Sequence, residues 1–507
     1  MKGDTKFVYD DIPYPSYTFP KTFPDRLATM AALYGMKSAD PANCRVLELG
    51  CGDGTNLLAM AYMTPGSTFT GIDLSKLHID RAKKSAEWIG GQNINFLQAD
   101  VTEIDARELG EFDYIIAHGL FSWVPEPVRD PILKLYSKCL APDGVGYISY
   151  NVFPGGHIRQ MVWEMMQYYT QDEPDFSIKI KKARAVAAFV ADSAGADSAY
   201  KAILDKEVES FSKRNDLNIF HDDLSENNQP FYFHDIAARL AKNGFKYIAD
   251  SDPETRIENA LSKEALKSLD AASGGDRIRR EQFADFIRGQ RFRRSIFCRD
   301  KINVSDVIQH AAVSDVLVAS RLKAAGSGDK DGAEKFIGPE NQNIQLNHIP
   351  TISLLKKLNS EWPRAIPFKD ALKETSNINL AEEDIAKCRL YILDLFHAEL
   401  VALHTHQPPF VREVSARPEA SRFARLQVAI GCQVVTTMAC TNVEMNNSPL
   451  RILISLLDGK HARKDLIKEM NERIEVPAEE KQALAEQLPQ MIESNLQKMA
   501  EIGLPIA

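Results

Sequence analysis

The sequence predicts an α/β fold: a doubly wound, Rossmann-like sheet of seven strands, with a helical insertion and C-terminal winged-helix-like modules. Three observations support this. Short β-rich runs alternate with amphipathic stretches over residues 45–150, residues 157–220 have helical patterning without strands, and residues 301–507 contain a weak internal repeat. Alternating strands and helices are typical of βαβ units and a mostly parallel sheet with helices on both faces.

Five short apolar runs, each bounded by Gly, Asp or Pro, predict the first strands of this sheet: residues 45–50, 67–73, 94–100, 112–119 and 145–151. Leu, Ala, Ile and Trp recur at three- and four-residue spacing over residues 56–62 and 76–89, which indicates helices between the strands. In a doubly wound sheet, ligands bind beyond the carboxyl ends of the strands.

Residues 157–220 are predicted to be a helical insertion, because the apolar positions there follow a helical period. After it, a helix that ends at Gly244 leads into an apolar run. We therefore expect the last two strands of the sheet at residues 245–250 and 292–298. A separate small domain over residues 220–300 is the alternative.

The C-terminal part is predicted to form two winged-helix-like modules, at residues 301–410 and 411–507, after a first domain at 1–300 that includes a regulatory-type segment at 221–300. Each module places a Pro-started apolar helix, a turn, a second helix and a long helix opened by paired acids. Coincidence between two helical stretches is the alternative. We expect each module to have its own small core, built on these leucines: Leu354, Leu355, Leu358, Leu453, Leu456 and Leu457.

Composition excludes several functional classes. The 507 residues carry a net charge of −9, and no segment concentrates Lys and Arg, so we expect no nucleic-acid partner. Seven scattered cysteines indicate neither a disulfide framework nor a zinc site. The N-terminus lacks the apolar run of a signal peptide, and no run of about 18 apolar residues occurs, so we expect a cytoplasmic protein without membrane insertion. His221, Asp222 and His234 have spacing that favours capping and core hydrogen bonds over a metal site, so no metal is expected.

A glycine-rich turn follows the first strand in the segment ELGCGDG, residues 48–54. Gly50, Gly52 and Gly54 allow a tight turn and a close approach of the backbone to a ligand. The acid Glu48 precedes a GxGxG spacing, which differs from the dinucleotide pattern GxGxxG. S-adenosylmethionine carries an ammonium and a carboxylate in place of a pyrophosphate, which suits this turn. The sequence predicts a site for it here, with Cys51 included.

Acids also end the next two strands. Asp73, in GIDLS with Leu74 beside it, can accept both ribose hydroxyls, and Asp100 can accept from the adenine amino group with Val101 against the ring. His118 is expected to offer its backbone carbonyl to the ammonium. A helix-capping role is the alternative for Asp73.

The methyl acceptor is expected beyond the fourth and fifth predicted strands, near His118, Phe121, Trp123, Tyr150 and Asn151. Trp123 and Tyr150 can face a methylammonium by cation–π attraction. Asn151 and the Tyr150 hydroxyl can accept from an incoming amine. Packing is the alternative for Trp123 and Phe121.

Two tyrosines before the first strand, Tyr14 and Tyr17, are candidates for a lid over the cofactor, with Tyr14 predicted to bind it. Surface anchoring is the alternative for both.

The chain resembles bacterial methyltransferases with a methyltransferase regulatory domain, which include the rickettsial protein-lysine methyltransferases. The motifs that carry the resemblance span almost the whole chain: YDDIPYPSYTFPKTFPDRLATMAALYGM (9–36), ELGCGDG, HGLFSWVP (118–125), SYNVFPG (149–155), NQPFYFHD (228–235), QFADFIRGQRFRRSIFC (282–298) and LLDGKHARKDL (456–466). The resemblance implies methyl transfer from S-adenosylmethionine, in some members to lysines of an outer-membrane protein before export. Phe23 replaces a His that is usual in this family, so this chain lacks an imidazole at that position.

The expected function is therefore N-methylation of lysine side chains in a protein substrate. An outer-membrane protein precursor is the candidate target that the resemblance implies. Methylation of a small metabolite or lipid headgroup is the alternative. A DNA-binding regulator is disfavoured, because the candidate recognition helices mix acids with bases. We also expect a homodimer through the insertion, since one of its helices carries many apolar residues, Met161, Val162, Met165, Met166 and Tyr169. Burial of these residues within one chain is the alternative.

Overall fold

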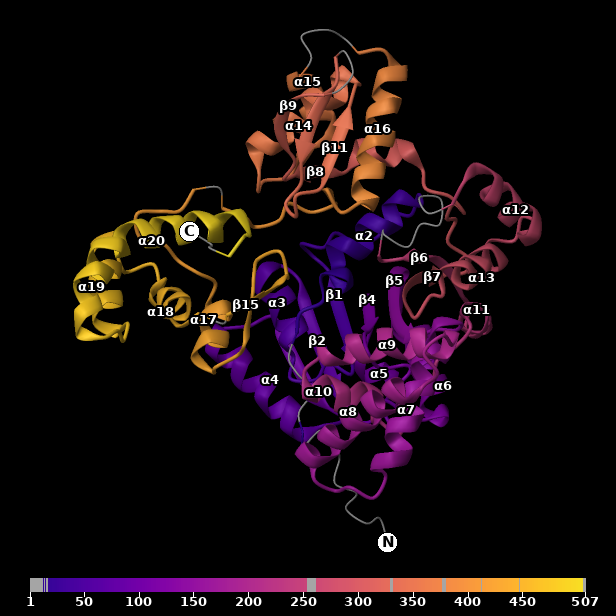
Figure 1. Ribbon diagram of the computed structural model, residues 1–507. Helices are drawn as coiled ribbons and strands as arrows, with labels where there is room; N and C mark the ends of the chain where they lie inside the picture. Colours follow the sequence, from indigo (N-terminus) through magenta and orange to yellow (C-terminus); the bar gives the residue numbers. More distant parts are fainter. Residues whose placement is uncertain are drawn as a thin grey trace.

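The computed structural model describes residues 12, 14, 17–252, 261–328, 332–375, 380–411, 413–445 and 447–504. Its centre is a seven-stranded sheet in the order β3-β2-β1-β4-β5-β7-β6, with β7 antiparallel to both neighbours (Figure 1). The strands are β1 (Arg45–Leu49), β2 (Thr68–Asp73), β3 (Ile94–Gln98), β4 (Phe112–Ala117), β5 (Leu140–Asn151), β6 (Phe245–Asp250) and β7 (Phe292–Arg299). The predicted seven-stranded fold is confirmed, and the region from 220 to 300 supplies two strands to this sheet.

Helices cover both faces of the sheet because successive side chains of each strand point to opposite sides. Val46 and Tyr114 pack in the same core as α2, α3 and α4, whereas Leu47 and Ile115 pack in the same core as α6 and α11. The helices around the sheet are η1 (Pro20–Thr22), α2 (Pro24–Leu33), α3 (Thr55–Met63), α4 (Lys76–Ile89), α5 (Ala106–Leu109), α6 (Glu126–Cys139), α11 (Phe233–Lys242), α12 (Lys263–Ser273) and α13 (Arg277–Arg288).

The insertion between β5 and β6 is helical, as predicted. It contains α7 (Gly155–Thr170), α8 (Phe176–Ser193), α9 (Ala199–Ser212), α10 (Asp216–Asn218) and the π-helix η2 (Ile219–Asp223). Val162 and Met166 are buried in a core formed by these helices themselves, which accounts for part of the apolar pattern. Tyr168, Tyr169 and Phe189 remain exposed on the surface of the insertion.

The middle module projects from the sheet next to α2 (Figure 1). It contains η5 (His310–Asp315), β8 (Leu317–Ser320), β9 (Lys323–Ser327), β10 (Glu334–Ile337), β11 (Asn343–Leu346), α14 (Ile349–Glu361), β12 (Ile366–Pro367), α15 (Phe368–Thr375), α16 (Glu382–His397) and β13 (Val401–His404). Leu354, Leu355 and Leu358 belong to a core that continues into α2 and the sheet. The prediction of an independent core is therefore wrong for this module, because α2 supplies apolar side chains that join the two.

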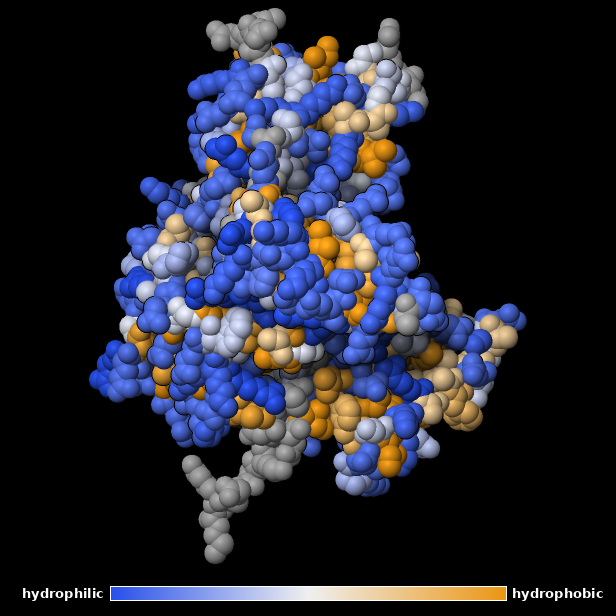
Figure 2. Space-filling view, turned by 90° about the vertical axis from the view of Figure 1, so that its left-hand side faces the viewer, coloured by the Kyte–Doolittle hydropathy of each residue, from blue (hydrophilic) through white to orange (hydrophobic). Residues whose placement is uncertain are grey.

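The C-terminal module has a core of its own, which includes Leu453, Leu456 and Leu457 as predicted. Its elements are α17 (Arg422–Ala429), β14 (Val434–Thr436), β15 (Asn442–Glu444), α18 (Ser448–Leu456), α19 (Arg463–Arg473), η6 (Ala478–Glu480) and α20 (Lys481–Glu501). Figure 2, which looks onto the side carrying this module, shows a mostly hydrophilic surface with apolar residues in small groups. No helix in the described part of the chain is long and apolar enough to cross a membrane.

Two glycines of the turn after β1 differ in their surroundings. Gly52 and Gly54 both have a positive φ, +55° and +77°. A Cβ on Gly54 would lie 2.5 Å from Phe96 Cζ, whereas a Cβ on Gly52 would meet no described atom within 4 Å. A side chain at either position would therefore strain the backbone, because φ is positive at both. Of the two, only a side chain at Gly54 would also overlap a neighbouring residue.

We therefore predict that Gly54→Ala lowers the free energy of unfolding by about 1–3 kcal/mol more than Gly52→Ala does. The strain of about 1–2 kcal/mol at a positive φ affects both variants and cancels in the comparison. Urea denaturation of the two purified variants measures the difference. Equal losses would show that Phe96 does not limit the space at Gly54.

Candidate active site

The turn after β1 lies at the carboxyl edge of the sheet, where it runs into α3. The backbone N–H groups of Gly50 and Cys51 donate to the carbonyl oxygen of Ile72 on β2, at 2.8 and 3.1 Å. These hydrogen bonds hold the turn against the neighbouring strand. The open space beside Gly52 is therefore bordered by backbone whose position is fixed. The Cys51 side chain is buried, and burial raises the pKa of its thiol.

Asp73 ends β2 next to this turn. Its Oδ2 accepts from the Gly52 N–H at 2.9 Å, and its Oδ1 accepts from the Ser75 N–H at 2.9 Å. The cap of α4 is Ser75, whose side chain accepts from the His78 N–H. Asp73 therefore ties the glycine turn to the start of α4, while Ser75 fills the capping role considered for it. Leu74 is 46% exposed, so an apolar side chain stands uncovered at this edge.

Asp100 lies two residues beyond β3, at the same edge of the sheet. Its Oδ1 accepts from both the backbone N–H and the hydroxyl of Thr102, at 2.8 Å each. Val101 is half-buried against the core on that side. Because β1, β2 and β3 are adjacent and parallel, the structure brings Glu48, Asp73 and Asp100 to one edge, the arrangement that the sequence predicted.

Glu48 is the most constrained of these acids, with only 3% of its surface exposed. Its Oε1 accepts from Asn56 Nδ2 at 2.7 Å, and its Oε2 is buried without a partner among the residues that the structure describes. Burial raises the pKa of this carboxyl to about 8, although the Asn56 hydrogen bond acts in the opposite direction. A buried oxygen that lacks a partner is suited to receive a cationic group.

Residues 17–22, which we call the N-terminal strap, lie across this edge. The Phe19 N–H donates to Asn56 Oδ1 at 2.9 Å, and the Phe19 ring lies 3.9 Å from the His118 ring, centroid to centroid. Thr18 is held by Asn442 of the C-terminal module, whose Nδ2 donates to the Thr18 carbonyl at 2.8 Å. The strap therefore contacts the sheet edge and the C-terminal module at neighbouring residues.

His118 follows β4 with its ring held in place. The ring Nδ1 lies 2.8 Å from the Tyr147 hydroxyl. Burial, with Arg294 nearby, lowers the pKa of His118 to about 3, so the ring is neutral at ordinary pH.

Three segments singled out in the sequence, HGLFSWVP, SYNVFPG and NQPFYFHD, meet beyond β4 and β5. The Ser122 hydroxyl accepts from the Asn151 N–H at 2.9 Å, and the Ser122 carbonyl accepts from the Gln229 N–H at 2.9 Å. Asn151 Nδ2 donates to Asn228 Oδ1 at 2.7 Å. We call this group of segments the acceptor edge. It fixes the side chain of Asn151.

The two aromatic candidates at the acceptor edge differ. Trp123 is half-buried, and its Nε1 is a buried donor without a partner in the described part of the chain. Tyr150 is fully buried, and its hydroxyl lies 2.9 Å from Ser295 Oγ on β7. The expectation that the Tyr150 hydroxyl meets an incoming amine is therefore corrected, because its side chain points into the core beneath the edge.

Tyr14 contacts the insertion. Its hydroxyl donates to Asp222 Oδ1 at 3.3 Å, and its ring lies 5.5 Å from that of His221. The Tyr17 hydroxyl accepts from Asn215 Nδ2 at 3.1 Å. These contacts favour the anchoring role over direct binding of a ligand by Tyr14.

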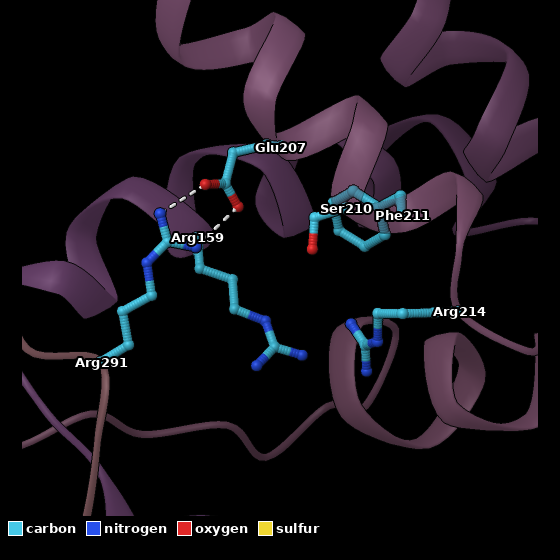
Figure 3. A pocket seen from close by; sticks show the side chains of 6 residues that line it. All are labelled: Arg159, Glu207, Ser210, Phe211, Arg214 and Arg291. Carbon is cyan, nitrogen blue, oxygen red and sulfur yellow. Dashed lines mark hydrogen bonds and ion pairs between the residues drawn. The ribbon is translucent and has the colours of Figure 1, made fainter. Parts of the chain in front are cut away.

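Asp222 is also part of a cluster of ion pairs with Arg159 and Arg214. Beside it is a cavity of about 180 Å³, drawn in Figure 3, into which several arginines of the insertion and its neighbourhood project. It is lined by Arg159, Glu207, Ser210, Phe211, Arg214 and Arg291. His234 lies against Gln282, and in the described residues no three His, Cys, Asp or Glu side chains gather as a metal site requires.

Comparison with known proteins identifies the family. Residues 46–144 match the family described as methyltransferase domain, and residues 215–299 match the predicted methyltransferase regulatory domain. Residues 416–504 match the PKMT C-terminal winged helix domain. An uncharacterized protein of Rickettsia prowazekii (strain Madrid E) is 32% identical over 73% of this chain and 68% of its own length.

The chain belongs to the methyltransferases with a regulatory domain. A second uncharacterized protein of the same organism is 33% identical over 49% of this chain and 99% of its own length. The solved structure of PKMT2 from Rickettsia typhi in complex with AdoHcy is 25% identical to this methyltransferase, with a TM-score of 0.86 over 98% of this chain and 100% of that one. The enzyme is an S-adenosylmethionine-dependent methyltransferase of class I.

The residues at the sheet edge fit this cofactor. The unpartnered oxygen of Glu48 suits its ammonium, and the space beside Gly52 leaves room for its methionine part. The carboxylate of Asp73 is held at this edge by the backbone N–H groups of Gly52 and Ser75, and a carboxylate is the strong acceptor that ribose hydroxyls require. Sequence reasoning missed Asn56, which holds Glu48. An Asn in the first turn of a helix gives no signal of such a role.

We predict that Gly52→Val and Asp73→Ala each weaken the binding of S-adenosylmethionine at least about 30-fold. Gly52→Val fills the open space, and Asp73→Ala removes charged hydrogen bonds worth about 2–3 kcal/mol. Isothermal titration calorimetry measures the affinity. Asp80→Ala, which removes an exposed carboxylate from α4, serves as the matched control and should bind normally. Normal binding by both site variants would place the cofactor elsewhere.

We also predict that binding releases a proton. With its pKa near 8, Glu48 is mostly protonated in the cofactor-free enzyme at neutral pH, and the cofactor's ammonium favours the carboxylate. Affinity should therefore rise with pH between about 5 and 8. In the same window the cofactor-free enzyme should lose stability as pH rises, because the folded state binds the proton more tightly than the unfolded chain.

Calorimetry in buffers of different ionisation enthalpy counts the released protons. Glu48→Gln cannot release one and provides the control. An unchanged proton count in that variant would assign the release to another group.

Proposed function

We propose that this methyltransferase methylates the amino group of lysine side chains in a protein substrate. The observation that carries the proposal is the make-up of the acceptor edge, where a neutral imidazole, an indole and an amide side chain lie. His118 is neutral, Trp123 is half-buried, and Asn151 is fixed by Asn228. Such surroundings desolvate an amine and lower its pKa, which frees the lone pair that attacks. The likeness to PKMT2, which extends over the C-terminal modules, also supports a protein substrate.

The bound cofactor supplies a methyl group on a sulfonium, which is already activated for displacement. The contribution of the chain is to position the two reactants. We propose that Glu48 and Asp73 hold the cofactor at the ends of β1 and β2, and that Asn151 accepts from the amine. His118, neutral and held by Tyr147, adds no positive charge that would repel a lysine. Loss of the amine's proton to water then requires no dedicated base.

Several finer assignments belong to this proposal. We place the domain boundaries at 1–300, 301–410 and 411–507, with the insertion at 157–220 and the regulatory-type segment at 221–300. We propose a cytoplasmic enzyme that acts on an outer-membrane protein precursor, without a nucleic-acid partner. A homodimer through the insertion is supported by the exposed aromatic side chains of α7 and α8, Tyr168, Tyr169 and Phe189.

We predict that the enzyme transfers a labelled methyl group to lysines of polypeptides in a host-cell lysate. The enzyme is incubated with labelled S-adenosylmethionine, and the modified residues are identified by mass spectrometry. The Asp73→Ala enzyme gives the background. Label confined to small metabolites or lipid headgroups would overturn the protein-substrate proposal.

A further inference from the structure

Asn56 is a buried polar residue near the start of α3, with 5% of its surface exposed. Its amide makes three hydrogen bonds to three other residues. Nδ2 donates to Glu48 Oε1 at 2.7 Å and to Thr22 Oγ1 at 3.1 Å, and Oδ1 accepts from the Phe19 N–H at 2.9 Å. One side chain thus joins the acid at the end of β1 to the strap.

Only an amide of this length can make this set of contacts, because it offers two N–H donors and an acceptor on one rigid plane. Thr22 completes the arrangement, since its hydroxyl donates to the Phe19 carbonyl at 2.8 Å. Because the Thr22 hydroxyl donates its proton to Phe19, its oxygen accepts from Asn56. Both N–H groups of the Asn56 amide are then used, one by Thr22 and one by Glu48. Its orientation is set by the strap on one side and by Glu48 on the other.

The orientation matters for the chemistry of Glu48. Asn56 holds Oε1, so that Oε2 is the carboxylate oxygen left for the cofactor. A donated hydrogen bond also favours the ionised carboxylate, and the Asn56 bond lowers the pKa of Glu48 against the effect of burial.

The strap adds a second consequence. The residue that binds Asn56, Phe19, also places its ring against His118 at the end of β4. The Asn56 amide thereby connects the ends of β1 and β4. A change in the position of the strap would therefore alter the Glu48 carboxylate through one side chain, that of Asn56.

We propose that Asn56 is a positioning residue of the methyl-transfer reaction: it fixes the Glu48 carboxylate for the cofactor's ammonium and, through the same amide, holds the N-terminal strap over the site. The inference rests on the cofactor site proposed above. Asn56 acts through Glu48 and the strap and does not itself touch the reacting atoms.

The test is Asn56→Leu in the full chain, a substitution that keeps the branching at Cγ and removes the hydrogen bonds. S-adenosylmethionine affinity is measured by calorimetry across pH. We expect about 10-fold weaker binding at neutral pH. We also expect the midpoint of the pH dependence to move to higher pH, because the carboxylate loses its donor. In a Glu48→Gln background, Asn56→Leu should produce no shift of the midpoint.

Asn93→Leu is the matched control. The Asn93 side chain is also an amide that holds three backbone carbonyl groups, those of Ala61, Thr64 and Ser67, near the other end of α3. It should lower stability without moving the pH midpoint. Thr22→Val, which removes only the hydroxyl that orients Asn56, should move the midpoint in the same direction by a smaller amount, and it serves if Asn56→Leu fails to fold.

The outcomes separate the two proposals. If Glu48→Gln alters binding but neither Asn56→Leu nor Thr22→Val moves the midpoint, Asn56 is a structural residue and the inference is overturned. If Glu48→Gln leaves both the affinity and its pH dependence unchanged, the proposed cofactor site itself is overturned.

Discussion

The buried carboxylate of Glu48 is the constraint on which the rest of the site depends. Removing a charged oxygen from water costs several kcal/mol unless partners replace the water. The chain supplies Asn56 for one oxygen and no described partner for the other. In the proposed site the ammonium of the cofactor completes the set, so that the charge of the carboxylate is balanced only when the site is filled. The glycine turn leaves open space beside Gly52, and the strap orients Asn56, the partner of the Glu48 carboxylate.

The strand order explains why the candidate site lies at this edge of the sheet. β1 lies between β2 and β4, so its carboxyl end borders Asp73 on one side and His118 on the other. β5 follows β4 and brings Asn151 to the same edge, where the segment around Asn228 closes against it. The residues proposed to bind the cofactor and those proposed to receive the methyl acceptor thus divide along the sheet. The first group belongs to β1–β3 and the second to β4, β5 and the regulatory segment.

The sheet and the cofactor turn could be predicted because their signals are local: short apolar runs, glycines at fixed spacing and acids at strand ends. Tyr150 could not be placed, because a strand covered on both faces shows no alternation that separates core from edge. Asn56 could not be identified from the sequence, because its partner Phe19 lies 37 residues away and an Asn near the predicted start of a helix is typical of capping. The leucines of α14 indicated a core, but their spacing could not show that α2 shares it.

The pairing of Thr18 with Asn442 has a consequence for biosynthesis. The two residues are 424 positions apart, so the strap can meet this partner only after the C-terminal module has been synthesised. A nascent chain can build β1 to β5 and the glycine turn much earlier, because those contacts are close in sequence. The site is therefore closed last. A nascent chain that has folded its sheet but not yet its C-terminal module lacks the Asn442 contact of the strap, so closure of the site depends on synthesis of that module.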